Sequence, residues 1–401
     1  MNQRSAQRIT QATLLFVAIG VVVTIVKTAG LQAQKDPPGA GPLIVHEWGT
    51  FTSVAGKNGV ALEWRPLNGA SDLPKFVHTI QNAGDGLRHG PKANLTAAVR
   101  METPVVYFYA ANETEISVKV DFPKGKITEW YPQARSVNTS IDWGRLKIMP
   151  GANLNLPVAY SDTSRYYAAR ETDAAPVQVC GTDGQSVQQE KFLFYRGVGT
   201  FELPLTVKLD GQTILLTNAD KQPISEVLLF ENRAGKVGYQ LVHNLSGDRA
   251  LNRPALDQNI DSLLAELKRV LIASGLYEKE AAAMIKTWRD SWFEEGLRVF
   301  YILPRQTTDA VLPITIDPRP SELVRVLVGR AEVITPEMEK SVREQIRQLG
   351  DASPQIREAA ARSIRERGRF SEPILKSILE SESNETIRER IKQLIQTSET
   401  E

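Results

Sequence analysis

Between residues 43 and 242 the chain repeats one pattern, in which short runs of alternating apolar and polar residues are separated by turn residues. Residues 115–122 show it most clearly, because every second side chain from Ile116 to Phe122 is apolar. Such alternation turns one face of a strand toward a core. Similar or fully apolar runs occupy residues 103–110, 126–131, 141–149, 192–195, 201–209, 213–217, 227–232 and 237–242. Many short strands at this spacing predict packed antiparallel sheets, a β-sandwich-like body.

Residues 254–295 interrupt the strands with a predicted helical hairpin. Apolar residues recur at three- and four-residue steps over residues 260–271, and a second helix is expected over residues 277–293. Strand-like runs then return at residues 298–303, 311–316 and 323–328. We therefore expect the hairpin to pack on the sheets, so that residues 43–334 form one α+β body.

Residues 335–401 contain an internal repeat. The helical segment 356–364 recurs as 387–395, at an offset of 31 residues, and each copy follows another helical segment and a polar turn. This pattern resembles a pair of HEAT-type α-hairpins, and the resemblance implies an all-α solenoid that stacks on or binds protein. Because arrays of this kind usually need about three units, we expect the two to lean on the β body or on a protein partner.

The N-terminal 33 residues are predicted to be a signal peptide or an N-terminal anchor. A basic segment without acidic residues precedes the apolar run 12–26, and Leu31-Gln32-Ala33 offers a cleavage site. The Pro-containing residues 34–42 form a linker. The protein is therefore expected to be exported to the periplasm or the extracellular space. Any contact with the membrane is expected only through residues 12–26, as a tether to the inner membrane if the leader is not cleaved.

Charge and cysteine content remove several classes of function. Lysine and arginine together number 48 and aspartate and glutamate 47, so the chain lacks the basic excess typical of nucleic-acid-binding proteins, and no nucleic-acid partner is expected. Cys180 is the only cysteine, which excludes an internal disulfide and a thiolate zinc cluster.

Three further segments carry a resemblance between the body and an uncharacterised family of exported bacterial proteins. They are His46-Glu47-Trp48-Gly49-Thr50-Phe51, Met101-Glu102-Thr103-Pro104-Val105, and Trp288-Arg289-Asp290-Ser291-Trp292-Phe293-Glu294-Glu295-Gly296. The resemblance covers most of residues 43–335. It implies export and carries no assigned activity or cofactor.

The first of these segments combines a histidine with a glutamate on a predicted strand. Strand alternation sends His46 and Glu47 to opposite faces unless a bulge intervenes, and Gly49 is a residue that permits one. Asn58-Gly59 then predicts a two-residue hairpin turn into a strand over residues 60–64. Further on, the segment from Ser71 to Pro74 has the composition of a helix start.

Two readings of the chemistry follow from these residues. A hydrolase would use His46, Glu102 and Glu294 as catalytic groups, and His46, His78 and His89 could hold a metal ion such as zinc. These residues lack any motif spacing, and a histidine on a strand is more often a packed core residue. Glu102 with another carboxylate could equally suggest a glycosidase, for which their separation would decide.

The second reading is a binding protein. The candidate ligand contacts are Trp48, Arg88, Tyr166 and Arg170. Exposed aromatic rings can stack on sugars or peptides, and long irregular segments such as residues 160–175 are often functional. The alternative is that the tryptophans fill the core. We expect an exported binding or assembly component that uses the β body and the HEAT-like tail, with a periplasmic, possibly metal-dependent hydrolase centred on His46 and Glu102 as the alternative.

Overall fold

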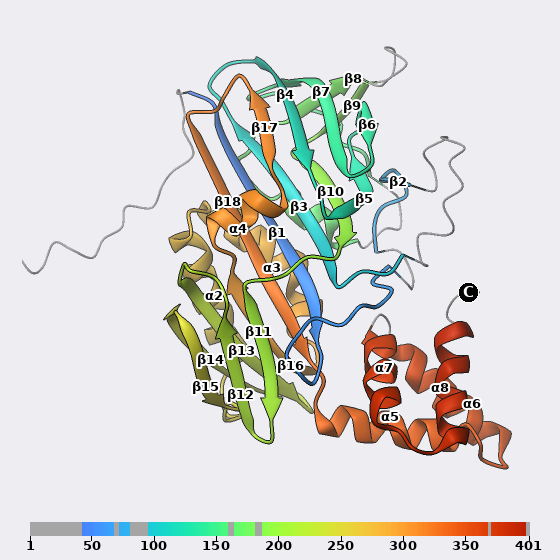
Figure 1. The fold of residues 1–401 in the computed structure, drawn as a ribbon. Coiled ribbons are helices and arrows are strands. Elements are labelled where there is room, and N and C mark those ends of the chain that lie inside the picture. The colour runs from blue at the N-terminus through green and yellow to red at the C-terminus, as the bar shows by residue number, and fades with distance from the viewer. Residues whose placement is uncertain are drawn as a thin grey trace, which may run out of the picture. The chain divides into compact units, whose positions relative to one another are not determined.

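A nine-stranded sheet lies at the centre of the structure, a computed structural model that describes residues 42–67, 72–80, 95–158, 164–180, 187–367 and 370–397 (Figure 1). Its strands, in spatial order, are β14 (Lys236–Leu245), β13 (Ile224–Arg233), β16 (Gly296–Ile302), β18 (Glu322–Val333), β1 (Ile44–Ala55), β3 (Val99–Tyr109), β10 (Leu193–Gly199), β5 (Gly125–Tyr131) and β2 (His78–Thr79). Neighbouring strands in this sheet run antiparallel except for β1 and β18, which run parallel over the whole length of β1.

Two smaller sheets cover one face of the central sheet. The first consists of β17 (Ile314–Asp317), β4 (Thr114–Asp121), β7 (Ser140–Ile148), β8 (Val177–Cys180) and β9 (Val187–Glu190), with β6 (Ser136–Val137) paired to β7. The second consists of β11 (Leu205–Asp210), β12 (Thr213–Asn218) and β15 (Gly247–Asn252). Apolar side chains from all three sheets form one continuous core, to which β4 contributes Ile116, Val118 and Val120 as its alternation predicts.

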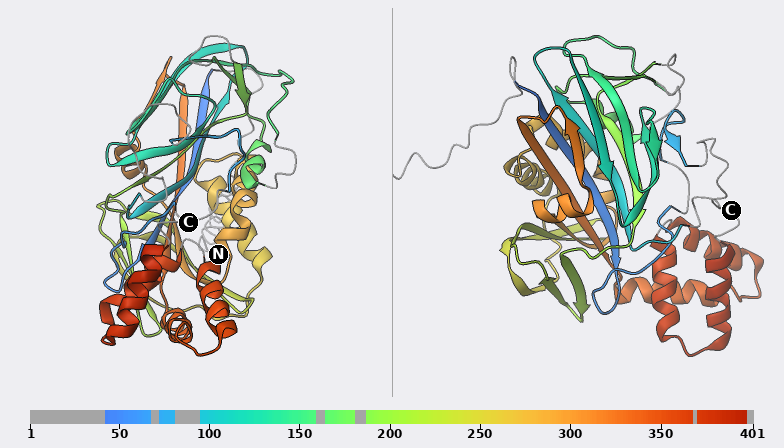
Figure 2. Two further views of the ribbon diagram at one scale, coloured as in Figure 1. Left: turned by 90° about the vertical axis from the view of Figure 1, so that its right-hand side faces the viewer. Right: turned by 45° about the horizontal axis from the view of Figure 1, so that its top comes forward.

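Helices cover the other face of the central sheet (Figure 2). They are α2 (Ile260–Ala273), α3 (Glu278–Trp292) and the 3₁₀ helix η2 (Arg165–Arg170). The predicted hairpin of residues 254–295 is therefore confirmed, and its apolar stripe forms a second core with β1, β3, β13, β16 and β18. A short helix, α4 (Arg305–Val311), connects β16 to β17. The fold is a mixed α and β structure with large, mainly antiparallel sheets.

A bulge does occur beside Gly49, the residue that permits one, but the extra residue lies in β3 and not in β1. The pairing of β1 with β3 shifts register opposite Gly49, where Thr103 has a positive φ of 48°. A Cβ atom at position 49 would come within 2.9 Å of the Cα of Pro104, so the bulge needs glycine there. Since β1 keeps its alternation, His46 and Glu47 face opposite sides of the sheet.

Two local predictions are wrong. Residues 56–60 do turn, but the expected strand over residues 60–64 is reduced to two isolated bridges, from Ala61 to Ala55 and from Trp64 to Ala97. The reason is that β18 and β3 already occupy the two edges of β1. The segment expected to begin a helix near Pro74 forms turns and the short strand β2 in its described part, residues 72–80. Edge pairing with β5 prevails there over the local helix-start signal.

The C-terminal residues form four helices around a core of their own. These are α5 (Pro336–Gln348), α6 (Pro354–Glu366), α7 (Ser371–Ser381) and α8 (Glu385–Thr397). The unit is fastened to the body by a buried ion pair, 2.8 Å from Arg65 to Glu372, and by stacking of Trp64 on Phe370. Within the described part of the chain, every helix is too short or too polar to cross a lipid bilayer.

Candidate functional site

His46 lies in the apolar core between β1 and α3, with no exposed surface. Its Nδ1 lies 2.8 Å from Oε2 of Glu280, and its ring packs 4.4 Å from that of Tyr277. Because a carboxylate only accepts hydrogen bonds, Nδ1 carries the hydrogen. Nε2 is buried and has no hydrogen-bond partner among the described residues.

Glu280 holds this part of the core together. It accepts hydrogen bonds from His46, from the Tyr109 hydroxyl at 2.7 Å and from the backbone N–H of Tyr277 at 2.8 Å. The last of these bonds belongs to a capping box at the start of α3. Burial and the neighbouring carboxylate of Glu280 raise the pKa of Tyr109 far above its ordinary value. The arrangement ties β1, β3 and α3 to one carboxylate.

Glu102 is equally buried but belongs to a different set of contacts. Its Oε2 accepts a hydrogen bond of 2.6 Å from Thr52, and its Oε1 lies 3.3 Å from Nε of Arg100. In the strand register Glu102 lies opposite Thr50, whereas His46 lies opposite Tyr107. The two groups nominated as the centre of a hydrolase thus share a face of the sheet but have separate partners.

Glu294 belongs to a charged cluster just beyond the C-terminal end of α3. Arg330 donates to Glu294 at 2.9 Å, and Arg330 and Arg298 both donate to Glu332. Arg298 also donates to the carbonyls of Trp292 and Glu294, which satisfies the end of the helix. Burial alone would raise the pKa of Glu332, but the two guanidinium groups hold it below its usual value.

A further buried guanidinium lies at the bulge of β3. Arg196 donates to Oγ1 of Thr103 and makes two hydrogen bonds, of 2.6 and 3.1 Å, with the carboxylate of Asp72. Burial would raise the pKa of Asp72, but the charge and hydrogen bonds of Arg196 outweigh it and hold the pKa well below the usual range. Strained backbone with buried charge is typical of functional sites, although here each charge has a counter-ion.

The ligand-contact candidates that fall in the described residues are Trp48, Tyr166 and Arg170, and all three are buried or half-buried. Trp48 has no exposed surface, and the tryptophans of the strands are all buried, which confirms the alternative that they fill the core. Tyr166 is also buried and donates to Glu190 at 3.0 Å. Arg170 pairs with the same carboxylate at 2.6 Å, so Glu190 fixes η2 against β9.

The histidines nominated as metal ligands are not brought together in the described structure. His78 lies on β2, where Nε2 is 3.2 Å from Oε1 of Gln188 and the ring stacks on Trp130. His89 and Arg88 fall outside the described residues. Within the described ranges, no group of three or more histidine, cysteine, aspartate or glutamate side chains is arranged to hold a metal ion.

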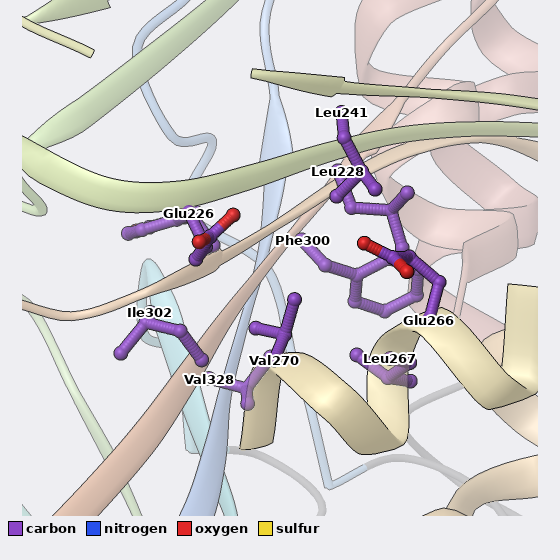
Figure 3. A pocket seen from close by; sticks show the side chains of 10 residues that line it. Glu226, Leu228, Leu241, Glu266, Leu267, Val270, Phe300, Ile302 and Val328 are labelled. Carbon is purple, nitrogen blue, oxygen red and sulfur yellow. The ribbon is translucent and has the colours of Figure 1, made fainter. Parts of the chain in front are cut away.

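Among the hollows of the surface, one is a narrow apolar slot between α2 and the strands β13, β14 and β16 (Figure 3). The carboxylates of Glu226 and Glu266 lie on either side of Phe300 at this slot. Its cavity volume of about 20 Å³ suits little more than a water molecule. Both carboxylates already have partners: Glu226 lies 2.6 Å from Nδ1 of His243, and Glu266 lies 2.5 Å from the guanidinium of Arg269.

A larger hollow, of about 410 Å³, opens beside the end of β3. It is lined by Tyr109, Ala110, Lys191 and residues 150–153 and 172–176. Another hollow, of about 340 Å³, lies where the first turn of α5 meets the body. Volumes of a few hundred Å³ are in the range of small-ligand sites.

The chain matches no family model and no curated protein sequence. The site therefore has to be interpreted from its own geometry.

Several residues that organise the site could not be identified from the sequence. Glu280 lies in a helical stretch where a glutamate in the first turn is ordinary, and only the fold brings it to His46, 234 positions away. A capping-box search would have found its bond to Tyr277, but not its partners on β1 and β3. Arg196 is a single charge within the apolar strand β10, a pattern that indicates buried pairing but not the partner. Arg330 shares β18 with Glu332, but its partner Glu294 lies outside that strand.

Proposed function

We propose that the protein is an exported binding or assembly component that contacts a partner protein through its C-terminal helices. The main support is that the candidate catalytic side chains form contacts within the fold. His46, Glu102 and Glu294 each hold a structural contact with Glu280, Thr52 or Arg330, and the first two are fully buried. These contacts support a structural role for the three side chains.

The C-terminal unit offers a surface with a different character. We assign the C-terminal unit to a HEAT-like class because two α-hairpins, α5–α6 and α7–α8, pack around one core. For the body, we propose a sandwich-like arrangement of the packed sheets. Its helix α7 is used for attachment, since Lys57 and Lys376 bridge it to the body in addition to Arg65. Residues 354–359 of α6 are all exposed, and Ile356 is 41% exposed.

Charge indicates the kind of partner. The helices α6 and α8 each carry three basic and two acidic side chains, and Arg365 is exposed in the last turn of α6. We therefore propose a partner protein that presents acidic side chains to α6. We also propose that residues 1–33 direct export of the protein, and that residues 12–26 tether it to the inner membrane if the leader is not cleaved.

The proposal is tested by charge reversal on α6. Cells that produce the protein would express tagged wild-type chain, the double variant Arg362→Glu/Arg365→Glu, or the control Lys208→Glu/Arg249→Glu, which makes the same charge change on exposed positions of the body. Quantitative mass spectrometry after affinity purification should recover an acidic partner with the wild type and the control, but not with the α6 variant. Equal recovery with all three chains, or recovery of no partner, would refute the proposal.

A further inference from the structure

The hollow beside the end of β3 contains one amine whose charge is not balanced by a direct contact. Lys191 lines this hollow and donates a hydrogen bond of 2.6 Å to the backbone carbonyl of Thr172. Among the described residues, no carboxylate lies within ion-pair distance of Nζ, although Asp173 and Glu190 are near enough to favour its charged form. Burial, with the charge of Lys279 adding to it, lowers the pKa of Lys191 below its ordinary value.

The neighbouring charges are already paired. Asp173 lies 2.5 Å from Nζ of Lys279, and Glu190 is held by Arg170 at 2.6 Å. When these two pairs are set aside, one cation remains, the half-buried amine of Lys191. Apart from Lys191, the lining carries one charged group, the carboxylate of Asp173, whose charge is matched by Lys279. A hollow with this single surplus positive charge suits a monoanion, because a phosphate group with two charges would favour several donors or an arginine.

We propose that this hollow binds the carboxylate of a small organic acid or of a peptide C-terminus, with Lys191 as its counter-ion. The volume of about 410 Å³ admits such a group together with a few neighbouring atoms. Side chains of modest size line the rest of the hollow, including Ala110, Asn153 and Pro176, so a short ligand meets both apolar contacts and hydrogen-bonding groups. This site lies on the sheet body and does not depend on the proposed docking through α6.

Isothermal titration calorimetry on the purified full chain tests the inference. The probes are butyrate, the peptide acetyl-Ala-Ala-Ala with a free C-terminus, and the same peptide amidated. Binding of butyrate alone assigns the site to small acids, and binding of the free-acid peptide alone assigns it to chain ends. If none of the probes binds at about 10 mM, or if the amidated peptide binds as well as the free acid, the inference is refuted.

Variants locate the binding. Lys191→Met should weaken the association constant about tenfold or more, since a hydrogen-bonded charge partner is lost, while Lys191→Arg should retain it. Lys208→Met, an exposed lysine on β11, is the matched control and should bind as the wild type does. Wild-type affinity in Lys191→Met would overturn the assignment. The comparison of acid and amide on the wild-type chain remains decisive if a variant fails to fold.

Discussion

Replacement of Glu280 by alanine is expected to destabilise the fold strongly. The substitution leaves three buried groups without an acceptor: the imidazole of His46, the hydroxyl of Tyr109 and the backbone N–H of Tyr277. An orphaned buried polar group costs about 1–3 kcal/mol, and removal of one partner from a buried charged network typically costs about 3–5 kcal/mol. We therefore expect Glu280→Ala to lower the free energy of unfolding by about 4 kcal/mol, a large fraction of a typical total.

Urea unfolding followed by circular dichroism measures this change. Glu280→Gln should be much milder, about 1 kcal/mol, because the amide oxygen can still accept from His46 and Tyr277 while the rotatable hydroxyl of Tyr109 accepts from the amide nitrogen. Glu266→Ala is the matched control. It removes a glutamate from α2 that forms a surface ion pair with Arg269, and it should cost no more than about 0.5 kcal/mol. A loss in Glu280→Ala as small as in the control would refute the reasoning.

Three further outcomes are expected. Arg196 depresses the pKa of Asp72 in the folded state. The contribution of Asp72 to stability is therefore complete above its unfolded-state pKa, near 4, and is lost as the pH falls below that value. Unfolding temperatures measured between about pH 6 and pH 2 should fall more steeply for the wild type than for Asp72→Asn. Gly329→Ala would place a Cβ atom 2.1 Å from the ring of Tyr301, and overpacking of this kind should lower the free energy of unfolding by about 2 kcal/mol in urea titrations. An unchanged free energy of unfolding would contradict the close packing of Tyr301 on this glycine. Arg65→Met removes the buried guanidinium that joins the body to Glu372 and leaves that carboxylate with Lys376 of its own helix, so limited proteolysis should cut the C-terminal helices faster than in the wild type. An unchanged cleavage rate would contradict their attachment through this pair.

Most of the elements could be predicted because their signals are local. The alternation in β4, the helical periodicity of α2 and the repeat in α6 and α8 all appear where the residue pattern places them. Errors arose where the outcome depended on distant strands. The segment after Asn58-Gly59 could not extend a hairpin because both edges of β1 are occupied, one by β3 and the other by β18, which begins only at Glu322.

The candidate site was predictable only in part, for the same reason. The sequence identifies His46 and Glu102 as candidates because they are polar residues in apolar strands, and both are buried in the structure. Whether such a residue reacts with a ligand or holds the core depends on its partner, and the partner of His46 is supplied by α3. Lys191 gave no signal, since a lysine next to a strand is usually solvent-exposed, and only the fold sets it in a hollow.

The proposed function depends most directly on whether α6 touches another protein. A photo-crosslinking amino acid placed at Ile356 on α6, and separately at Val60 on the body, tests this at two exposed positions, 41% and 56% accessible. Irradiation of cells that produce these chains should give one discrete adduct to an acidic protein at position 356, which disappears in the Arg362→Glu/Arg365→Glu background, and none at position 60. An adduct with a second copy of the chain, an adduct unaffected by the charge reversal, or no adduct at position 356 would contradict the account.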